Sequence, residues 1–348
     1  RINTEIKDKE LVVVPDKNFS LNNAVLSHGQ LMEADLPERK KLLPWLPEGG
    51  LIMVAAPRGI GKTFFGTDLA VKVASGGEFL KWEVENTAGV LYVDGEMPLG
   101  QFRERYSSFI NHQPENFFIL SHEWLWDKAE TDLTITLKNI QDEMFDCLNL
   151  RPNIRLIILD NLSSLSNIRE DKSDNWRDRF LPFLIKCRRR SVAVVLIHHV
   201  NKSGEQRGTG AREDYLDASI VLKSLGGESN EGAQFKVEFT KCRGAYGEVI
   251  DPFSAILKKV DGFYEWEIGD PDMKVKDRLK LLIGNSGTDG VTVTEAAEEL
   301  EVSKGAISKA KSKLIEDGTI KAGKRMKLDK FPQKRAQLYP VKHGNFCE

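Results

Sequence analysis

Short apolar runs alternate with segments of helical apolar spacing over the first two thirds of the chain. The runs are rich in Val, Ile and Leu, as expected for strands that are buried on both faces of a sheet. Strands connected by helices predict an α/β fold with a mainly parallel sheet and right-handed crossovers. We expect strands at 51–54, 89–93, 117–120, 155–160 and 192–197, and helices at 64–74, 101–111, 137–150 and 175–190.

The pattern changes in the last third of the chain. Residues 218–222, 234–241 and 253–258 alternate between apolar and polar side chains, which predicts antiparallel strands joined by short turns. Residues 1–40 are polar and mixed, apart from a β-like run at 11–14, and are expected to form an arm or linker. The chain therefore divides into an N-terminal arm at 1–40, a main domain at 41–268 and a small C-terminal domain at 269–348.

The first predicted strand leads into a glycine-containing turn, A-P-R-G-I-G-K-T, and then a helix. Gly59 and Gly61 would let backbone N–H groups approach phosphate oxygens, Lys62 would place a charge on the β- and γ-phosphates, and Thr63 would offer a hydroxyl to Mg²⁺. Ala56 replaces the first glycine of the strict motif, a small departure because that position needs little side chain. A glycine turn without a ligand is the alternative, but the strand–turn–helix context favours a nucleoside triphosphate site. The predicted contacts are Ala56, Pro57, Arg58, Gly59, Ile60, Gly61, Lys62, Thr63 and Phe64.

Acidic residues and a histidine stand where further predicted strands end, at the edge where ligands bind in open α/β sheets. Asp160 has the place of a Walker B carboxylate, which binds Mg²⁺ through water. Glu96 is expected to orient or deprotonate an attacking water. The alternative acid, Asp94, falls within the final alternation of side chains along the strand. His199 would report the γ-phosphate or be an ordinary strand-end histidine, and position alone does not decide. Trp45 could pack on a base, but such a Trp more often covers a domain edge.

Two groups of basic residues are open to more than one interpretation. The glycine-rich segment N-K-S-G-E-Q-R-G-T-G-A-R-E-D would suit a nucleic acid backbone through Lys202, Arg207 and Arg212, although a solvated surface loop is the more ordinary interpretation. Lys241 and Arg243 point to the same side of a strand. They could reach a neighbouring subunit's γ-phosphate as an arginine finger does, or they are ordinary surface charges.

A helix–turn–helix pattern with a basic wing occupies the C-terminal domain. Two helices are predicted, at 294–300 and 305–316, with Thr292 or Thr294 and then Ser303 as their caps. From the second cap to the last histidine, twelve Lys or Arg stand against three Asp or Glu, a local net charge of about +9. This charge indicates nucleic acid binding, and the alternative is a winged helix that contacts protein. The candidate DNA contacts are Lys304, Lys309, Lys313, Lys324 and Arg325.

Composition narrows the class of protein but not its function. The 348 residues are 41% hydrophobic and 29% charged with a net charge of −2, as in a globular protein. The four cysteines lack C-x-x-C spacing, which argues against a zinc site and favours a reducing cytoplasm. No apolar run approaches the roughly 20 residues that cross a bilayer. Because the chain begins with Arg1 rather than Met, we expect that it was cut from a longer protein.

Together these motifs resemble the RecA-like P-loop ATPases, an AAA-type group, and within them the RepA-like and DnaB-like hexameric replicative helicases. The resemblance covers about residues 40–260 and rests on A-P-R-G-I-G-K-T, V-D-G-E-M-P, L-I-I-L-D-N, I-H-H-V-N-K, R-G-T-G-A-R and T-K-C-R-G-A-Y-G. It implies that Glu96 is the catalytic glutamate, that His199 senses the γ-phosphate, and that Lys241 and Arg243 act in trans. The winged helix is outside the core helicase pattern and looks like those appended to replication proteins of plasmids and mobile elements.

The resemblance implies a function that the residues alone leave open. We expect a cytoplasmic, hexameric, ATP- and Mg²⁺-dependent DNA translocase or helicase that replicates a plasmid, phage or mobile element. Single-stranded DNA would lie in a central channel, and duplex DNA at the winged helix. The alternative is a recombinase-like or regulatory DNA-binding ATPase switch without unwinding activity, and a small-molecule kinase would leave the basic C-terminal domain without a use.

Overall fold

The computed structural model describes residues 4–7, 10–13, 20–36, 38–110, 114–166, 176–199, 214–225, 233–270, 275–286, 290–300, 302–321 and 323–327. The chain forms two compact units, Arg1–Arg39 and Lys40–Glu348, which are described separately. The boundary predicted between the main and C-terminal domains lies inside the second unit and stays a prediction. Within the described residues, no helix is both long and apolar enough to cross a membrane.

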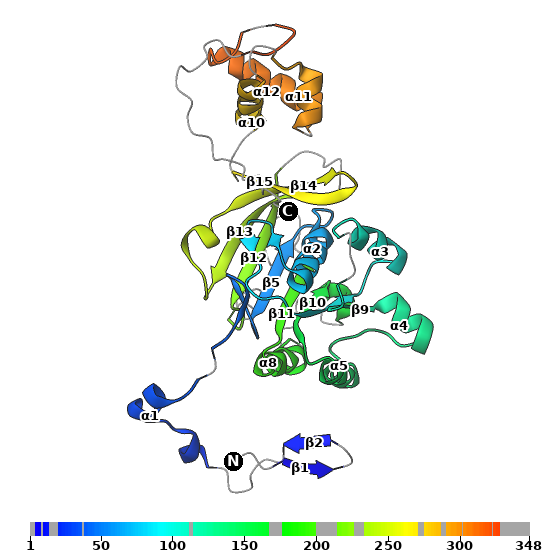
Figure 1. Cartoon of the computed structure of the whole chain (residues 1–348). Helices are drawn as coiled ribbons and strands as arrows, with labels where there is room; N and C mark the ends of the chain where they lie inside the picture. Colours follow the sequence, from blue (N-terminus) through cyan, green and yellow to red (C-terminus); the bar gives the residue numbers. More distant parts are fainter. Residues whose placement is uncertain are drawn as a thin grey trace, which may run out of the picture. The chain divides into compact units, whose positions relative to one another are not determined.

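A nine-stranded sheet organises the second unit, in the order β15-β14-β13-β12-β5-β11-β10-β8-β9 (Figure 1). The strands from β12 to β9 are mutually parallel, and β13, β14 and β15 continue the sheet antiparallel. The prediction of a mainly parallel α/β sheet with antiparallel C-terminal strands is therefore confirmed. The strands are β5 (Leu51–Ala56), β8 (Gly89–Asp94), β9 (Phe117–Ser121), β10 (Ile154–Asp160), β11 (Ala193–His199), β12 (Ala218–Ser224), β13 (Gln234–Cys242), β14 (Phe253–Val260) and β15 (Phe263–Gly269).

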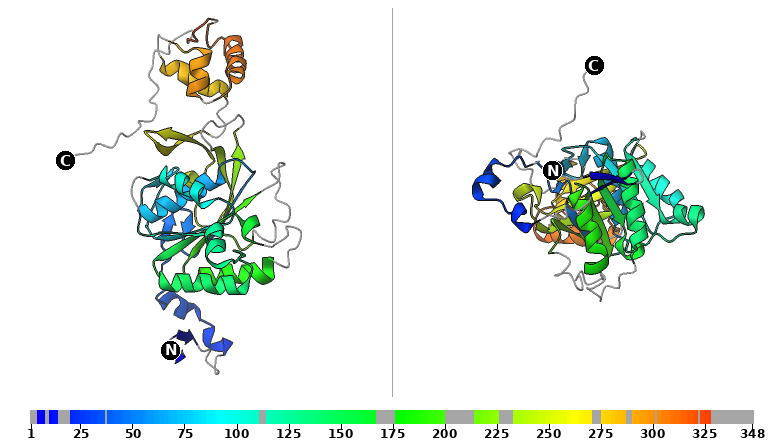
Figure 2. Two further views of the ribbon diagram at one scale, coloured as in Figure 1. Left: turned by 90° about the vertical axis from the view of Figure 1, so that its right-hand side faces the viewer. Right: turned by 90° about the horizontal axis from the view of Figure 1, so that it is seen from below.

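Helices cover both faces of this sheet, which is why the parallel strands are apolar throughout (Figures 1 and 2). Along β5 the side chains of Ile52 and Val54 join one apolar cluster, and those of Leu51 and Met53 join the other. The first cluster includes α2 (Lys62–Ser75) and α3 (Leu99–Ser107), and the second includes α5 (Lys138–Leu150), α6 (Leu162–Leu165) and α8 (Leu181–Arg189).

The observed elements differ from the predicted ones in a few places. β12 pairs antiparallel with β13 as expected, but it also joins the parallel sheet beside β5. The helix predicted at 175–190 begins as a π-helical turn, η2 (Trp176–Phe180), before α8. Trp45 is buried against Trp82 and Phe239 in the core. The remaining elements are β3 (Lys41–Leu43), β4 (Leu46–Pro47), β6 (Glu78–Phe79), β7 (Trp82–Glu83), α4 (His122–Ala129) and η3 (Gly247–Val249).

The N-terminal unit contains a β-hairpin and two short helices. The hairpin pairs β1 (Thr4–Lys7) with β2 (Glu10–Val13), which is where the β-like run was predicted. η1 (Leu21–Ala24) and α1 (His28–Glu33) follow. Ser27 and Gln30 form a capping box at the start of α1, a helix without a buried residue.

Three helices form the C-terminal module: α10 (Val275–Asn285), α11 (Val293–Glu299) and α12 (Lys304–Glu316). They enclose a separate apolar cluster that includes Leu279, Ile307 and Leu314. Thr292, one of the two candidates, caps α11, and Ser303 caps α12 as predicted. Beyond α12, Met326 forms a β-bridge with Val291, and the winged-helix assignment stays a prediction.

Candidate active site

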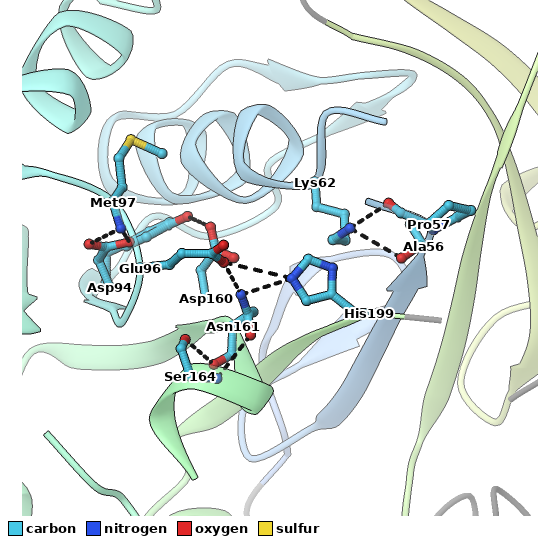
Figure 3. A network of polar contacts seen from close by, with 11 residues as sticks. Ala56, Pro57, Lys62, Asp94, Glu96, Met97, Asp160, Asn161, Ser164 and His199 are labelled. Carbon is cyan, nitrogen blue, oxygen red and sulfur yellow. Dashed lines mark hydrogen bonds and ion pairs between the residues drawn. The ribbon is translucent and has the colours of Figure 1, made fainter. Parts of the chain in front are cut away.

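The turn after β5 has the backbone shape of a phosphate-binding loop. Gly59 and Gly61 adopt φ angles of 77° and 102°, a left-handed region that favours glycine, and α2 begins at the next residue, Lys62. The Lys62 ammonium donates to the carbonyl oxygens of Ala56 at 3.1 Å and Pro57 at 2.5 Å (Figure 3). The loop therefore encloses this cation at the N-terminus of a 14-residue helix, where anions bind favourably.

Burial and nearby acids control the charge of Lys62. Burial lowers the pKa of its ammonium to about 8, and the carboxylates of Asp160 and Glu96 oppose that shift. The neighbouring Arg58 guanidinium lowers the pKa further. Lys62 therefore lies close to Asp160 and Glu96, the acids predicted to serve Mg²⁺ binding and hydrolysis.

Asp160 ends β10 at the same edge of the sheet, because the C-terminal ends of parallel strands meet there. Its carboxylate accepts a hydrogen bond from the Tyr92 hydroxyl at 2.7 Å and one from the Thr63 hydroxyl. Burial raises the pKa of Asp160, whereas these two donors lower it. The structure thus brings together the two residues predicted to serve Mg²⁺, Thr63 and Asp160.

The two acids of V-D-G-E-M-P have different environments. Asp94 is buried, its carboxylate accepts from the Met97 N–H at 3.1 Å, and burial raises its pKa to about 7. The Glu96 side chain is 66% exposed and reaches the cavity described below. Asp94 therefore holds the turn, and Glu96 is the acid that is available for chemistry.

Glu96, Asn161 and His199 form one polar network (Figure 3). The Asn161 amide nitrogen donates to the Glu96 carboxylate and lies 3.0 Å from Nε2 of His199. Nε2 of His199 is 3.7 Å from Oε2 of Glu96. Burial and the charge of Lys62 lower the pKa of His199, while Glu96 opposes them, so the neutral imidazole is favoured. His199 is therefore linked to Glu96 through the Asn161 amide.

A cavity of about 450 Å³ lies over these residues, and a second of about 780 Å³ shares Phe64, Gln101 and Arg105 with it. The first cavity suits Mg²⁺ and phosphates, because Thr63 and Asp160 offer the hydroxyl and carboxylate oxygens that Mg²⁺ prefers, and Lys62 adds a positive charge. In the described part of the chain, no group of three or more His, Cys, Asp or Glu could hold a metal. The first cavity is lined by Arg58, Gly59, Gly61, Lys62, Thr63, Phe64, Asp94, Glu96, Met97, Pro98, Gln101, Arg105, Asp160 and His199.

Lys241 and Arg243 lie away from this cavity. Cys242, between them, is opposite Ala218 on β12, and Ala218 is opposite Ile52 on β5. Ile52 lies four residues before the end of β5, which is roughly 13 Å along the strand at 3.3 Å per residue. The pair therefore lies toward the other edge of the sheet from the phosphate-binding loop of its own chain. The Arg243 guanidinium donates to the Asp214 carbonyl at 2.8 Å.

The predicted DNA contacts fall into three groups. Lys202, Arg207 and Arg212 lie outside the described residues. Lys304, Lys309 and Lys313 are exposed on α12, and Lys324 is exposed after it. Arg325 has an internal role, because its guanidinium donates to the Gly290 carbonyl at 3.0 Å and to Glu295 at 3.0 Å.

Several residues of the site were not among those predicted, and four of them stand out. Asn161 follows Asp160 directly in L-I-I-L-D-N, and a strand-end Asn before a short helix was the signal that could have identified it. Tyr92 lies inside an apolar strand, so nothing in the sequence separates it from a core tyrosine. Arg105 and Tyr264 reach Phe64 from α3 and β15, and only the fold brings them together.

One family model matches a little over half of the chain, and two solved structures are similar to it. Residues 20–205 match the family model described as the AAA domain. A KaiC-like protein of the hyperthermophilic archaeon Pyrococcus horikoshii OT3 is similar at 16% identity, covering 66% of this chain and 99% of that one, with a TM-score of 0.46. The flagellar accessory protein FlaH of Methanocaldococcus jannaschii is similar at 16% identity, covering 64% and 91%, with a TM-score of 0.42. No curated protein matches the chain.

Proposed function

The chain belongs to the AAA-domain family, whose model spans 186 of its 348 residues (20–205), and is an ATPase; from this premise we propose that it is an ATP-driven DNA translocase. It acts as a helicase in the replication of a plasmid, phage or mobile element, and its subunits hydrolyse ATP at their interfaces. The observation that carries the proposal is the separation of Lys241 and Arg243 from the phosphate-binding loop of the same chain.

Within one subunit, each residue of the cavity has a distinct task. Lys62 binds the β- and γ-phosphate oxygens, and backbone N–H groups of the loop support it. Thr63 and Asp160 hold Mg²⁺, which when bound neutralises charge on the phosphates. Glu96 orients the attacking water and accepts its proton. His199 detects whether the γ-phosphate is present.

The second cavity suits the base and ribose of the nucleotide. Phe64 lies at the start of α2, its ring meets that of Tyr264 edge-on at 5.4 Å, and the Arg105 guanidinium lies 4.6 Å from the centre of the Phe64 ring. Aromatic and guanidinium planes stack on nucleobases. Because both cavities are lined by Phe64 and Arg105, the base is held beside the phosphates.

Hydrolysis needs a neighbouring copy of the chain in this proposal. Lys241 and Arg243 cannot approach the γ-phosphate of their own subunit, since they lie roughly 13 Å back along the sheet. A neighbour in a ring presents that edge to the next cavity, so the pair stabilises charge on the transferred phosphate in trans. This arrangement makes hydrolysis depend on assembly, as a ring helicase requires.

DNA binds at two places in the proposal. Single-stranded DNA binds to Lys202, Arg207 and Arg212, which lie outside the described residues, and α12 contacts duplex DNA as the recognition helix of a winged helix. Support for the second comes from the exposed face of α12, where Lys309 and Lys313 accompany Ser308 and Ser312, while Ile307 and Leu314 are buried on the opposite face.

Molar mass in solution tests the proposal first. We expect a species of about six chains, as in the ring helicases that the motifs resemble, with a non-hydrolysable ATP analogue and single-stranded DNA, and unwinding of a forked duplex when ATP is supplied. A monomer under every condition would remove the trans role. The alternative, a regulatory switch, predicts ATP-dependent DNA binding without unwinding, so the forked substrate separates the two functions.

A further inference from the structure

We propose that Asn161 is a positioning residue for hydrolysis, whose side-chain amide joins the Glu96 carboxylate to the His199 imidazole. The inference rests on the roles proposed above for Glu96 and His199. Asn161 itself is only 2% exposed, so it acts through these two side chains.

The short helix α6 fixes the orientation of the Asn161 amide. Oδ1 of Asn161 accepts from the Ser164 N–H at 3.1 Å and caps α6. The Ser164 hydroxyl returns a hydrogen bond to the Asn161 carbonyl at 3.0 Å. Because Oδ1 is engaged by the cap, the amide nitrogen is the group that faces Glu96 and His199 (Figure 3).

The amide nitrogen in turn selects one form of His199. An amide nitrogen only donates, so Nε2 of His199 must accept, and the ring proton is then on Nδ1. The Glu96 carboxylate is farther from Nε2, at 3.7 Å, than the Asn161 amide nitrogen at 3.0 Å, so the amide is the nearer partner of Nε2. Asn161 therefore holds His199 as the neutral Nδ1–H tautomer.

Strand order explains why a linking residue is needed. His199 ends β11 and Glu96 follows β8, and β10 lies between these two strands. Asn161 directly follows β10, so its amide bridges the gap that the intervening strand creates. The amide also engages Oε2 of Glu96, which leaves Oε1 as the oxygen that accepts a proton from water. Loss of the amide would let a largely exposed carboxylate rotate away.

An Asn161→Ser variant separates this role from helix capping. Serine is also a good N-cap, so the α6 cap is kept, but its hydroxyl is too short to reach Glu96 and His199. We expect kcat to fall about tenfold or more, the KM for ATP to change less than about twofold, and the thermal midpoint to stay within about 2 °C. A wild-type or raised kcat would overturn the proposal, because capping alone would then explain the residue.

A spectroscopic measurement on the nucleotide-free protein gives an independent answer. The ¹⁵N shifts of His199, assigned with a His199→Gln variant, should report the Nδ1–H tautomer in the wild type and a shift toward Nε2–H in Asn161→Ser. An Nε2–H wild type, or tautomers that the substitution leaves unchanged, would overturn the link. If Asn161→Ser does not fold, Asn161→Asp replaces it, since aspartate also caps helices but has no N–H. A wild type without ATPase activity would contradict the proposed function and leave this second test intact.

Discussion

The indole nitrogen of Trp266, on β15, donates to the carboxylate of Asp68, on α2, at 3.0 Å. This bond ties the outermost antiparallel strand to the helix that begins at the phosphate-binding loop. Burial raises the pKa of Asp68 to about 7, although the Trp266 bond and the charge of Lys72 lower it. The helix that orients the loop thus carries a carboxyl group that titrates near neutral pH.

We predict that Asp68 makes stability fall as the pH rises. The folded pKa of about 7 exceeds the ordinary value of 3.8, so the folded protein keeps a proton that the unfolded chain has lost. The stabilisation is complete below about pH 4 and lost as the pH rises through 7. Asp68→Asn should therefore gain stability relative to wild type between pH 4 and 8, by roughly 4 kcal/mol. Denaturant unfolding at several pH values measures the difference, and Glu83→Gln, at an exposed carboxylate, is the control.

A second prediction concerns the hydrogen bond that the Tyr92 hydroxyl donates to Asp160. Tyr92→Phe removes one of the donors that stabilise a buried carboxylate, and we expect a loss of about 1–3 kcal/mol in the free energy of unfolding. ATP binding in the presence of Mg²⁺ should weaken as well, because Asp160 would then hold its proton more tightly. Chemical denaturation and calorimetric titration provide the two readouts.

The matched control is Tyr106→Phe, at a half-buried tyrosine of α3 that packs on Phe117 at 4.7 Å. It loses a hydroxyl without removing a donor from Asp160, so it should leave the affinity for ATP unchanged. Equal effects of the two substitutions would mean that the Tyr92 hydroxyl has no special relation to Asp160.

Much of the sheet and of the phosphate-binding loop could be predicted because local chemistry specifies them. A strand buried on both faces must be apolar, and a turn with two positive φ angles requires residues such as Gly59 and Gly61. The acids at strand ends follow from the same pattern, since parallel strands gather their C-terminal ends at one edge. Predictions for Lys62, Glu96 and Asp160 depended only on this local information.

What the sequence did not reveal depends on contacts between distant segments. Arg105 and Tyr264 are 159 positions apart, yet both reach the Phe64 ring. The bond from Trp266 to Asp68 likewise joins segments that no local periodicity relates. Arg325 was predicted to contact DNA because the sequence shows its charge. The sequence does not show its hydrogen bond to the Gly290 carbonyl. Side-chain partners across the fold are therefore the information that spacing alone lacks.

A third prediction tests hydrolysis at the subunit interface. Arg243→Ala should abolish most ATPase activity in the assembled protein without altering nucleotide affinity, because the residue lies away from its own cavity. Glu96→Gln should also be inactive. Mixing the two variants should restore activity, up to roughly a quarter of the wild-type rate for random assembly, since some interfaces then pair an intact Glu96 with an intact Arg243. A mixture as inactive as its components would place both residues in one subunit's reaction.

A fourth prediction concerns DNA binding by α12. Alanine at both Lys309 and Lys313 should weaken binding of duplex DNA and reduce the slope of log K against log salt by about 2, because each lysine neutralises one phosphate. Lys280→Ala, at an exposed lysine of α10, removes one positive charge from another helix and should have little effect. Fluorescence anisotropy at several salt concentrations measures the slope.

Arg325 distinguishes a contact with DNA from a contribution to the module itself. Arg325→Ala leaves the Gly290 carbonyl without this donor and removes an ion pair with Glu295, so we expect a lower thermal midpoint for the module. Lys309 and Lys313 are on the exposed face of α12, so their substitution should leave that midpoint unchanged while the salt slope falls. If Arg325→Ala instead lowers the slope at constant stability, its guanidinium contacts phosphate directly. If all three substitutions leave the slope unchanged, α12 and the segment after it do not bind DNA, and the loop after His199 would have to supply the whole of DNA recognition.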